Sequence, residues 1–85
     1  MSVEEQFKSA ADRVKGLTSR PTNEQLLELY ALFKQGTDGD VTGARPGMFD
    51  LKGRAKYDAW AAKKGTAKAA AQQAYVALVD KLVKG

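Results

Sequence analysis

Apolar side chains recur at helical spacing in four segments of the chain, and no segment alternates apolar and polar residues long enough to predict a strand. Ser2 opens the first segment and Glu5 follows three residues later, which is the pattern of a capping box. The apolar stripe that comes next consists of Val3, Phe7, Ala10, Ala11 and Val14. This pattern predicts a helix that begins at Ser2 and ends near Gly16.

A second helix is predicted over residues 23–35. Thr22 and Gln25 repeat the capping-box pattern at its start. Its apolar stripe is Leu26, Leu29, Tyr30 and Phe33. Gly36 should stop this helix, because it opens a stretch rich in Gly and Pro that predicts a loop of about a dozen residues. Loops of that length in a compact domain are usually functional.

The third predicted helix covers residues 51–64, with Asp50 as its cap and Gly65 as its end. Lys63 and Lys64 would stand in its last turn, where cations complement the helix dipole. Gly53 lies early in this helix, and we expect it to allow close approach of another backbone or a ligand.

A fourth helix is predicted over residues 67–84, with Thr66 as its cap. Its apolar stripe is Ala71, Ala74, Tyr75, Leu78, Val79 and Leu82. The ring of Tyr75 is expected to be half buried. The fold class is therefore predicted as all-α, with four helices in one domain over residues 1–85.

The absence of His and Cys limits the catalytic reactions that the chain could support. These residues supply the commonest general base, the commonest metal ligand and the easiest nucleophile. A binding protein is thus favoured over an enzyme, and disulfides are excluded. The net charge of +4 is a mild indication of an anionic partner. The acidic start "MSVEEQF" has no hydrophobic signal core, and no run is apolar enough to span a membrane. We expect a small soluble protein of the cytoplasm.

The loop at residues 38–49 begins like a calcium-binding EF-hand loop, with "DGDVTG" at its first six positions. The twelfth position must supply a bidentate carboxylate but is Phe49, and the ninth position is Pro46. No calcium site or other metal site is therefore predicted, and Asp38 and Asp40 are interpreted as turn formers.

Lysines adjoin aromatic rings on the second and third helices, which suits a ligand with a phosphorylated aromatic end. Tyr30 and Lys34 project from one side of their helix, and Lys52, Lys56 and Lys63 share a face of the next, one turn from Trp60. Spacing alone favours a simpler alternative, in which the rings are core and the lysines are solvated.

A nucleic-acid or partner-helix module is a further alternative from another class. Asp50 and Asp58 interrupt the basic residues of the third helix, and there is no arginine cluster. We therefore predict no nucleic-acid partner. The two acids are interpreted as a helix cap and a solvated carboxylate rather than as an acid–base pair.

The motifs "YALFKQGTDGD", "RPGM" and "LKGRAKYDAWAAKKGT" stand in one register and resemble the acyl-CoA-binding protein family. The resemblance covers essentially the whole chain. It implies an up-down four-helix bundle that binds medium- to long-chain fatty acyl-CoA thioesters non-covalently, as a carrier and pool buffer without a cofactor. It also implies a monomer with no stable membrane insertion and only transient contact with enzymes that use acyl-CoA. An enzyme acting on CoA esters is the remaining alternative.

The same resemblance implies which residues touch the ligand, with the CoA 3′-phosphate and adenine between the second and third helices. Lys34 and Lys56 would clamp that phosphate, and the hydroxyl of Tyr30 would join them. Phe33 would stack near the adenine, although the family often has Tyr at this position. Further expected contacts are Tyr75, Lys15 and Lys52.

Overall fold

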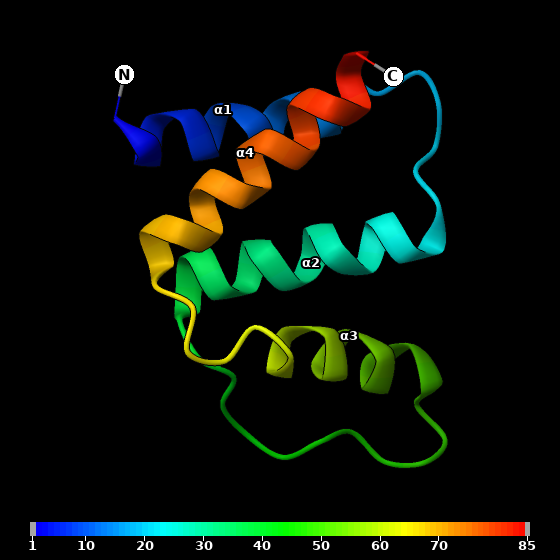
Figure 1. Ribbon diagram of the computed structural model, residues 1–85. Coiled ribbons are helices and arrows are strands. Elements are labelled where there is room, and N and C mark those ends of the chain that lie inside the picture. Colours follow the sequence, from blue (N-terminus) through cyan, green and yellow to red (C-terminus); the bar gives the residue numbers. More distant parts are fainter. Residues whose placement is uncertain (1, 85) are drawn as a thin grey trace.

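The computed structural model describes residues 2–84, which form four helices and no strand (Figure 1). The helices are α1 (Val3–Val14), α2 (Asn23–Asp38), α3 (Leu51–Ala61) and α4 (Lys68–Lys84). α1 and α4 run one way and α2 and α3 the other, because the long loop carries the chain back before α3 begins (Figure 1). The predicted all-α bundle of four helices is confirmed, with its directions in the order up, down, down, up.

The three predicted caps before α1, α2 and α3 are present. Ser2 Oγ accepts a hydrogen bond from the Glu5 N–H at 3.2 Å, and Asp50 caps α3 in the same manner. Thr22 and Gln25 form a complete capping box, in which each side chain accepts from the other residue's backbone N–H at 3.1 and 2.9 Å. Local side-chain chemistry therefore determines where these helices begin.

The prediction that Gly36 ends the second helix is wrong, because α2 continues through it to Asp38. A Cβ atom at Gly36 would lie 3.0 Å from Gln72 Cγ and 3.2 Å from Phe7 Cζ. The missing side chain thus lets α1 and α4 approach α2 closely. The packing outweighs the cost of one helical glycine, which is about 1 kcal/mol.

α3 ends at Ala61, three residues before the predicted end. The next N–H groups, those of Lys63 and Lys64, bond to carbonyls three residues back at 2.9 and 3.1 Å, so the chain leaves the helix in a tight turn. Lys63 lies beyond the end of α3, and its ammonium pairs with Glu28 of α2 at 2.8 Å. It does not line the space between α2 and α3 that Lys52 and Lys56 share.

Thr66 lies one residue before the cap of α4 rather than at it. The first hydrogen bond of α4 runs from the Ala71 N–H to the Ala67 carbonyl at 3.0 Å. Thr66 instead offers its own carbonyl to the buried Gln35 amide at 2.8 Å. The predicted cap was therefore placed one residue too early.

The apolar core lies among α1, α2 and α4, and Figure 1 shows α3 on the outer side of α2. The buried core residues are Phe7, Ala10, Leu29, Leu32, Tyr75 and Val79. Ala74, expected on the buried stripe of α4, is exposed, and Val76 packs against the core instead. α3 buries a single side chain, Trp60. The contact between α2 and α3 is thus separate from the main core.

Candidate functional site

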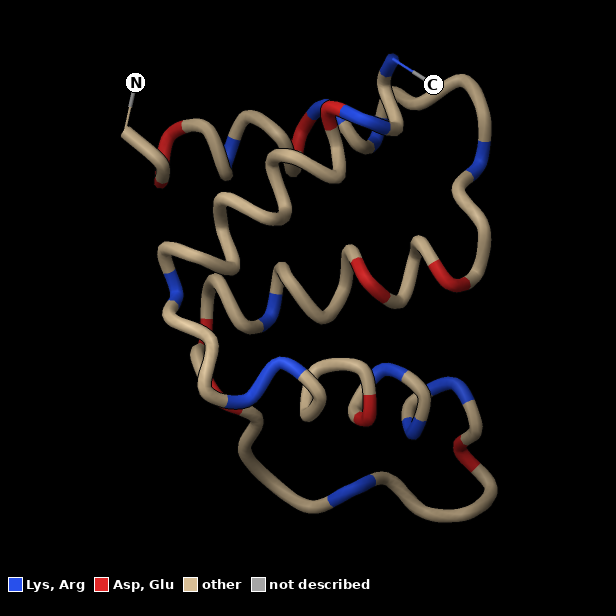
Figure 2. Tube along the Cα trace, viewed as in Figure 1, with Lys and Arg blue, Asp and Glu red and all other residues tan. Residues whose placement is uncertain are grey.

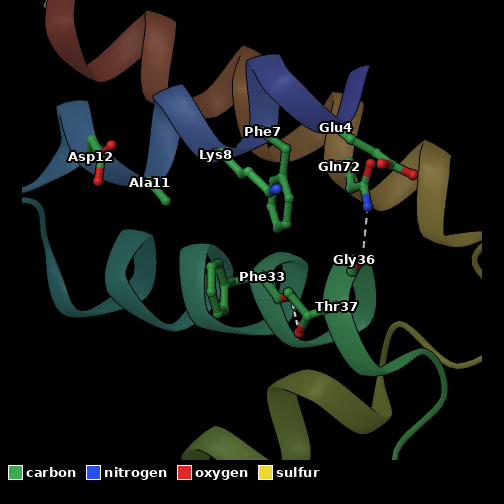
Figure 3. A pocket seen from close by; sticks show the side chains of 9 residues that line it. All are labelled: Glu4, Phe7, Lys8, Ala11, Asp12, Phe33, Gly36, Thr37 and Gln72. Atoms are coloured by element: carbon green, nitrogen blue, oxygen red, sulfur yellow. Dashed lines mark hydrogen bonds between the residues drawn. The ribbon is translucent and has the colours of Figure 1, made fainter. Parts of the chain in front are cut away.

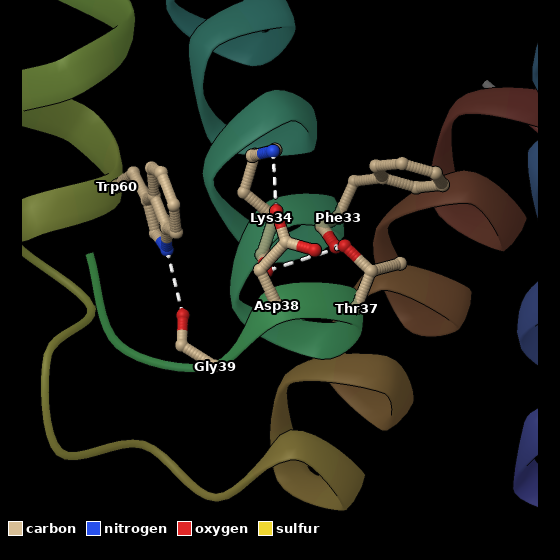
Figure 4. Close-up of polar contacts among 6 residues, drawn as sticks. All are labelled: Phe33, Lys34, Thr37, Asp38, Gly39 and Trp60. Carbon is tan, nitrogen blue, oxygen red and sulfur yellow. Dashed lines mark hydrogen bonds and ion pairs between the residues drawn. The ribbon is translucent and has the colours of Figure 1, made fainter. Parts of the chain in front are cut away.

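The predicted contact residues lie on two sides of α2. Figure 4 shows that the neighbours Phe33 and Lys34 leave α2 on different sides, with Lys34 against Trp60 of α3 and Phe33 toward α4. α2 therefore turns Lys34 toward α3 and the ring of Phe33 toward α1 and α4. A ligand with a charged end and an apolar end could contact both.

The space between α2 and α3, here called the basic hollow, has a volume of about 430 Å³. Its walls bring together Tyr30, Lys52 and Lys56, and the Lys56 Nζ lies 5.5 Å from the centroid of the Tyr30 ring. Arg20 adds a cation that the sequence reasoning missed. Its position depends on the path of the connection between α1 and α2, for which helical spacing gives no signal. An anionic group would find several cations here.

Lys34 lies one turn after Tyr30 on α2 and does not line this hollow. Its ammonium is already engaged (Figure 4). Its Nζ is 4.9 Å from the centroid of the Trp60 ring and forms an ion pair with Asp38, one turn later in α2. The hydrogen bond to Asp38 raises the pKa of Lys34, and the same bond lowers the pKa of Asp38. An incoming phosphate would therefore compete with the Asp38 carboxylate for this lysine.

The space between α1 and α2, here called the apolar cleft, has a volume of about 510 Å³ (Figure 3). Phe7 and Phe33 both line it and pack against each other, with 5.4 Å between their ring centroids. Gln72 closes one end, because its amide donates to the Gly36 carbonyl at 2.9 Å. Exposed charged residues stand at its edge: Glu4, Lys8 and Asp12. An apolar chain could lie against the rings while water reaches the edge.

A third space of about 370 Å³, the junction hollow, adjoins the other two. Tyr30 lines both it and the basic hollow, and Phe33 lines both it and the apolar cleft. Its wall also includes Lys15 and Tyr75. Tyr75 is only 4% exposed rather than half buried, and this burial raises the pKa of its phenol. The three hollows thus follow one another around α2, from cations to aromatic rings, and together they are called the groove.

The structure therefore places six of the seven expected contact residues in the walls of this groove, with Lys34 beside it. Phe33 lies between the apolar cleft and the junction hollow rather than in the basic hollow. A ligand that stacks on Phe33 would therefore have to pass from the basic hollow through the junction hollow. That these residues bind a ligand stays a prediction.

The long loop is held against α3 by side chains of that helix. Arg45 donates two hydrogen bonds to Asp58 at 2.9 and 2.7 Å, so Asp58 is not the solvated carboxylate that was expected. The Arg45 guanidinium lowers the pKa of the Asp58 carboxyl. The Tyr57 hydroxyl donates to the Gly43 carbonyl at 2.9 Å, and the Trp60 indole N–H donates to the Gly39 carbonyl at 2.8 Å. These bonds position the helix that carries Lys52 and Lys56.

Asp40 joins the start of the loop to the turn after α3. Its Oδ1 accepts from the Gly65 N–H and from the Gln35 amide, both at 2.9 Å. These two bonds lower the pKa of the Asp40 carboxyl. Asp40 is thus a link between distant segments rather than a simple turn former, and no group of acids within residues 2–84 is arranged to hold a metal ion.

Gly53 makes room for the cap of α3 rather than for a ligand or another backbone. A Cβ atom there would lie 2.7 Å from Asp50 Cγ and 2.9 Å from Asp50 Oδ1. The Gly53 N–H donates to that same carboxylate at 2.9 Å. The expected approach of another backbone is not what crowds Gly53, because the three nearest atoms all belong to the capping side chain.

Comparisons with known proteins find the same similarity along nearly the whole chain. A family model described as "Acyl CoA binding protein" matches residues 4–79. Acyl-CoA-binding protein homolog 1 of Caenorhabditis elegans is 62% identical over 77 residues, which are 91% of this chain and 90% of that protein. The homolog of Drosophila melanogaster is 53% identical over 81 residues, 95% and 94% of the two chains. The crystal structure of Oryza sativa acyl-CoA-binding protein 2 matches with a TM-score of 0.93 and 42% identity, over 98% of this chain and 92% of that one.

Proposed function

Because this chain belongs to the acyl-CoA-binding protein family, we propose that it binds acyl-CoA thioesters reversibly and carries them without chemical change. The observation that supports this function best is the series of adjoining hollows around α2, which is cationic at one end and lined by aromatic rings at the other. An acyl-CoA has the same division, with phosphates on the nucleotide and hydrocarbon on the acyl group. We propose chains of medium to long length.

The cations would recognise the CoA part of the ligand. Lys56 and Lys52 face the basic hollow together with the Tyr30 ring, and Lys34 stands next to it. Lysine binds phosphate as a point charge, and a hydrogen bond to a charged group contributes about 1.5–3 kcal/mol. Lys15, in the wall of the junction hollow, would face the middle of the ligand. These contacts would select CoA esters over free fatty acids.

The rings would bind the acyl part. Each methylene removed from water contributes about 0.8 kcal/mol, so ten of them contribute about 8 kcal/mol before costs. Ordering the chain and losing translational freedom take back a large share of this. Phe7, Phe33 and Tyr75 form one aromatic cluster beside the cleft, with centroid distances of 5.1 to 5.9 Å. The apolar end would therefore provide most of the affinity.

A carrier rather than an enzyme is proposed because the groove offers few groups that could attack a thioester. The chain has no His and no Cys. Two of its carboxylates near α3, Asp40 and Asp58, are engaged in structural hydrogen bonds. We further propose that it works as a monomer in the cytoplasm and meets the enzymes that use acyl-CoA only transiently.

Calorimetric titration with palmitoyl-CoA, free CoA and palmitate tests this function. We expect one-to-one binding of palmitoyl-CoA that is far tighter than that of either fragment, since both ends of the groove are then filled. Equal or absent binding of all three would refute the proposal.

Substitution Lys56→Ala tests the basic hollow within the same titration. It should weaken binding of palmitoyl-CoA by about tenfold to a hundredfold, because one charged hydrogen bond is lost. Lys81→Ala removes an exposed lysine of α4 outside the groove, and serves as the matched control with unchanged binding. Equal losses in the two variants would show that net charge, rather than the basic hollow, determines affinity.

A further inference from the structure

Three large apolar side chains are exposed together where the long loop enters α3. Met48 is 75% exposed, Phe49 103% and Leu51 75%. We call this group the apolar tip. Single exposed apolar residues are ordinary in proteins, but a contiguous group of large ones marks an interaction site. The groove does not account for it, because neither Met48 nor Phe49 lines any of its three hollows.

The tip is presented by hydrogen-bonded backbone rather than by an open stretch of loop. The Asp50 N–H donates to the Gly47 carbonyl at 3.0 Å, which closes a turn with Met48 and Phe49 at its corner. The Asp50 side chain then caps α3 immediately before Leu51. These bonds hold the three side chains outward on a convex corner of the molecule.

Cations stand directly behind the tip. Lys52 and Lys56 follow it on the first turns of α3, and within residues 2–84 neither forms an ion pair with a carboxylate. Arg20 lies across the basic hollow from them. Figure 2 shows this end of α3 with its Lys and Arg residues close together. The two acids that flank these lysines in the sequence are engaged, Asp50 as a cap and Asp58 with Arg45.

We propose that the apolar tip docks this protein reversibly on an anionic lipid surface. Met48, Phe49 and Leu51 enter the boundary between headgroups and acyl chains, and Lys52, Lys56 and Arg20 face the anionic headgroups. A protein partner fits less well, because a stable interface covers about 800 Å² on each side and three side chains on a convex corner offer far less. Such docking involves side chains only; no helix within residues 2–84 is long and apolar enough to cross a membrane.

Docking would also bring the groove to the place where its ligand is found, and this part of the inference rests on the proposed function. Leu51 belongs to the tip and, with Lys52, also lines the basic hollow. An acyl-CoA is an amphiphile that partitions into bilayers through its acyl chain. The tip would thus place the entrance of the groove against the surface from which the ligand leaves.

Co-sedimentation of the full chain with lipid vesicles, in the absence of acyl-CoA, tests the docking. We expect binding to vesicles of equal parts phosphatidylserine and phosphatidylcholine, and much weaker binding to phosphatidylcholine alone. Substitution Met48→Ser with Phe49→Ser should weaken the binding by at least about tenfold, because two apolar side chains no longer leave water. Val83→Ser changes an apolar residue of α4 that is 51% exposed and far from the tip, and should change nothing.

Equal binding of the parent protein and the double variant, whether both sediment or neither does, would overturn the proposal. So would a lipid-free dimer, detected by sedimentation equilibrium, that the double variant loses, since the tip would then contact a second copy. Titration with palmitoyl-CoA in vesicle-free buffer separates this result from the proposed function. The double variant should bind like the parent protein there, and failure of both to bind would refute the carrier function while leaving the docking result intact.

Discussion

The two halves of the groove are held together by different forces. The half formed by α1, α2 and α4 surrounds a core of interlocked apolar side chains, in which Ala10 and Val79 are fully buried. The half formed by α3 and the long loop buries Trp60 alone, and otherwise depends on hydrogen bonds and on the ion pair between Arg45 and Asp58. Both partners of that pair are half exposed.

We therefore expect the apolar end of the groove to be more stable against local unfolding than the basic end. Regions with few buried apolar contacts and exposed polar contacts open locally before the rest of a protein unfolds. We therefore expect α3 to detach from α2 more readily than α1 detaches from α4. The cations of the basic hollow would move with α3, because Lys52 and Lys56 lie on it.

The largest effect is expected from Leu32→Ala in the core. Leu32 is 5% exposed and belongs to the core cluster of α1, α2 and α4. Truncation of a buried Leu usually lowers the free energy of unfolding by about 2–5 kcal/mol. Urea denaturation followed by circular dichroism would measure this, with Val83→Ala as the exposed control that changes little. If hydrogen exchange showed that Leu32→Ala lowers amide protection in α3 alone, this would contradict the assignment of the core.

Acidification should release α3 before the core. The pKa values of Asp58 and Asp40 are lowered in the folded protein, by Arg45 and mainly by the Gly65 N–H respectively. Their stabilising contribution is therefore complete above the ordinary carboxyl pKa of about 3.9 and is lost as the pH falls through the lowered values. Trp60 is the only tryptophan and is buried on α3, so its fluorescence reports this helix. We expect its emission to shift at a higher pH than the loss of helical circular dichroism.

Asp58→Asn should shift the change in Trp60 emission to a higher pH, because it removes the charge that Arg45 binds. Asp80→Asn is its matched control, since it breaks a similarly exposed pair with Arg13 that joins α4 to α1. The control should leave the emission of Trp60 unchanged. Coincident transitions by both methods, in the parent protein and in both variants, would show that the two halves form one cooperative unit.

The sequence predicted best those features that depend on a few neighbouring residues. The caps at Ser2, Thr22 and Asp50 are correct because a capping side chain bonds within three residues of itself. The end of α2 was misplaced because the environment of Gly36 comes from Phe7 and other distant residues. Helical periodicity carries no information on such contacts.

The site shows the same limit. The spacing of the lysines and rings along α2 and α3 suggested a groove, and the family resemblance selected the residues that line it. Two features needed the folded chain: the approach of Arg20 to the basic hollow, and the hydrogen bonds of Asp58 to Arg45 across the loop. The Lys34–Asp38 pair could have been predicted from the sequence, because residues four apart share a helix face. The structure was needed to show that the Asp38 carboxylate forms an ion pair with the Lys34 ammonium.

The smallest predicted effect is a change in ligand affinity when this ion pair is removed. It tests whether Asp38 competes with the ligand for Lys34 or orients Lys34 for it. Asp38→Asn removes the carboxylate that competes for Lys34 and leaves the lysine against Trp60. We expect palmitoyl-CoA to bind a few-fold more tightly, because phosphate no longer has to displace or repel that charge, and the pKa of Lys34 to fall toward its ordinary value. Asp80→Asn changes the net charge equally without touching the groove and should leave the affinity unchanged in the same calorimetric titration. Weaker binding by Asp38→Asn would instead show that the carboxylate holds Lys34 in the orientation that phosphate requires. The Asp38 carboxylate would then pre-organise the basic end for its ligand rather than compete with that ligand.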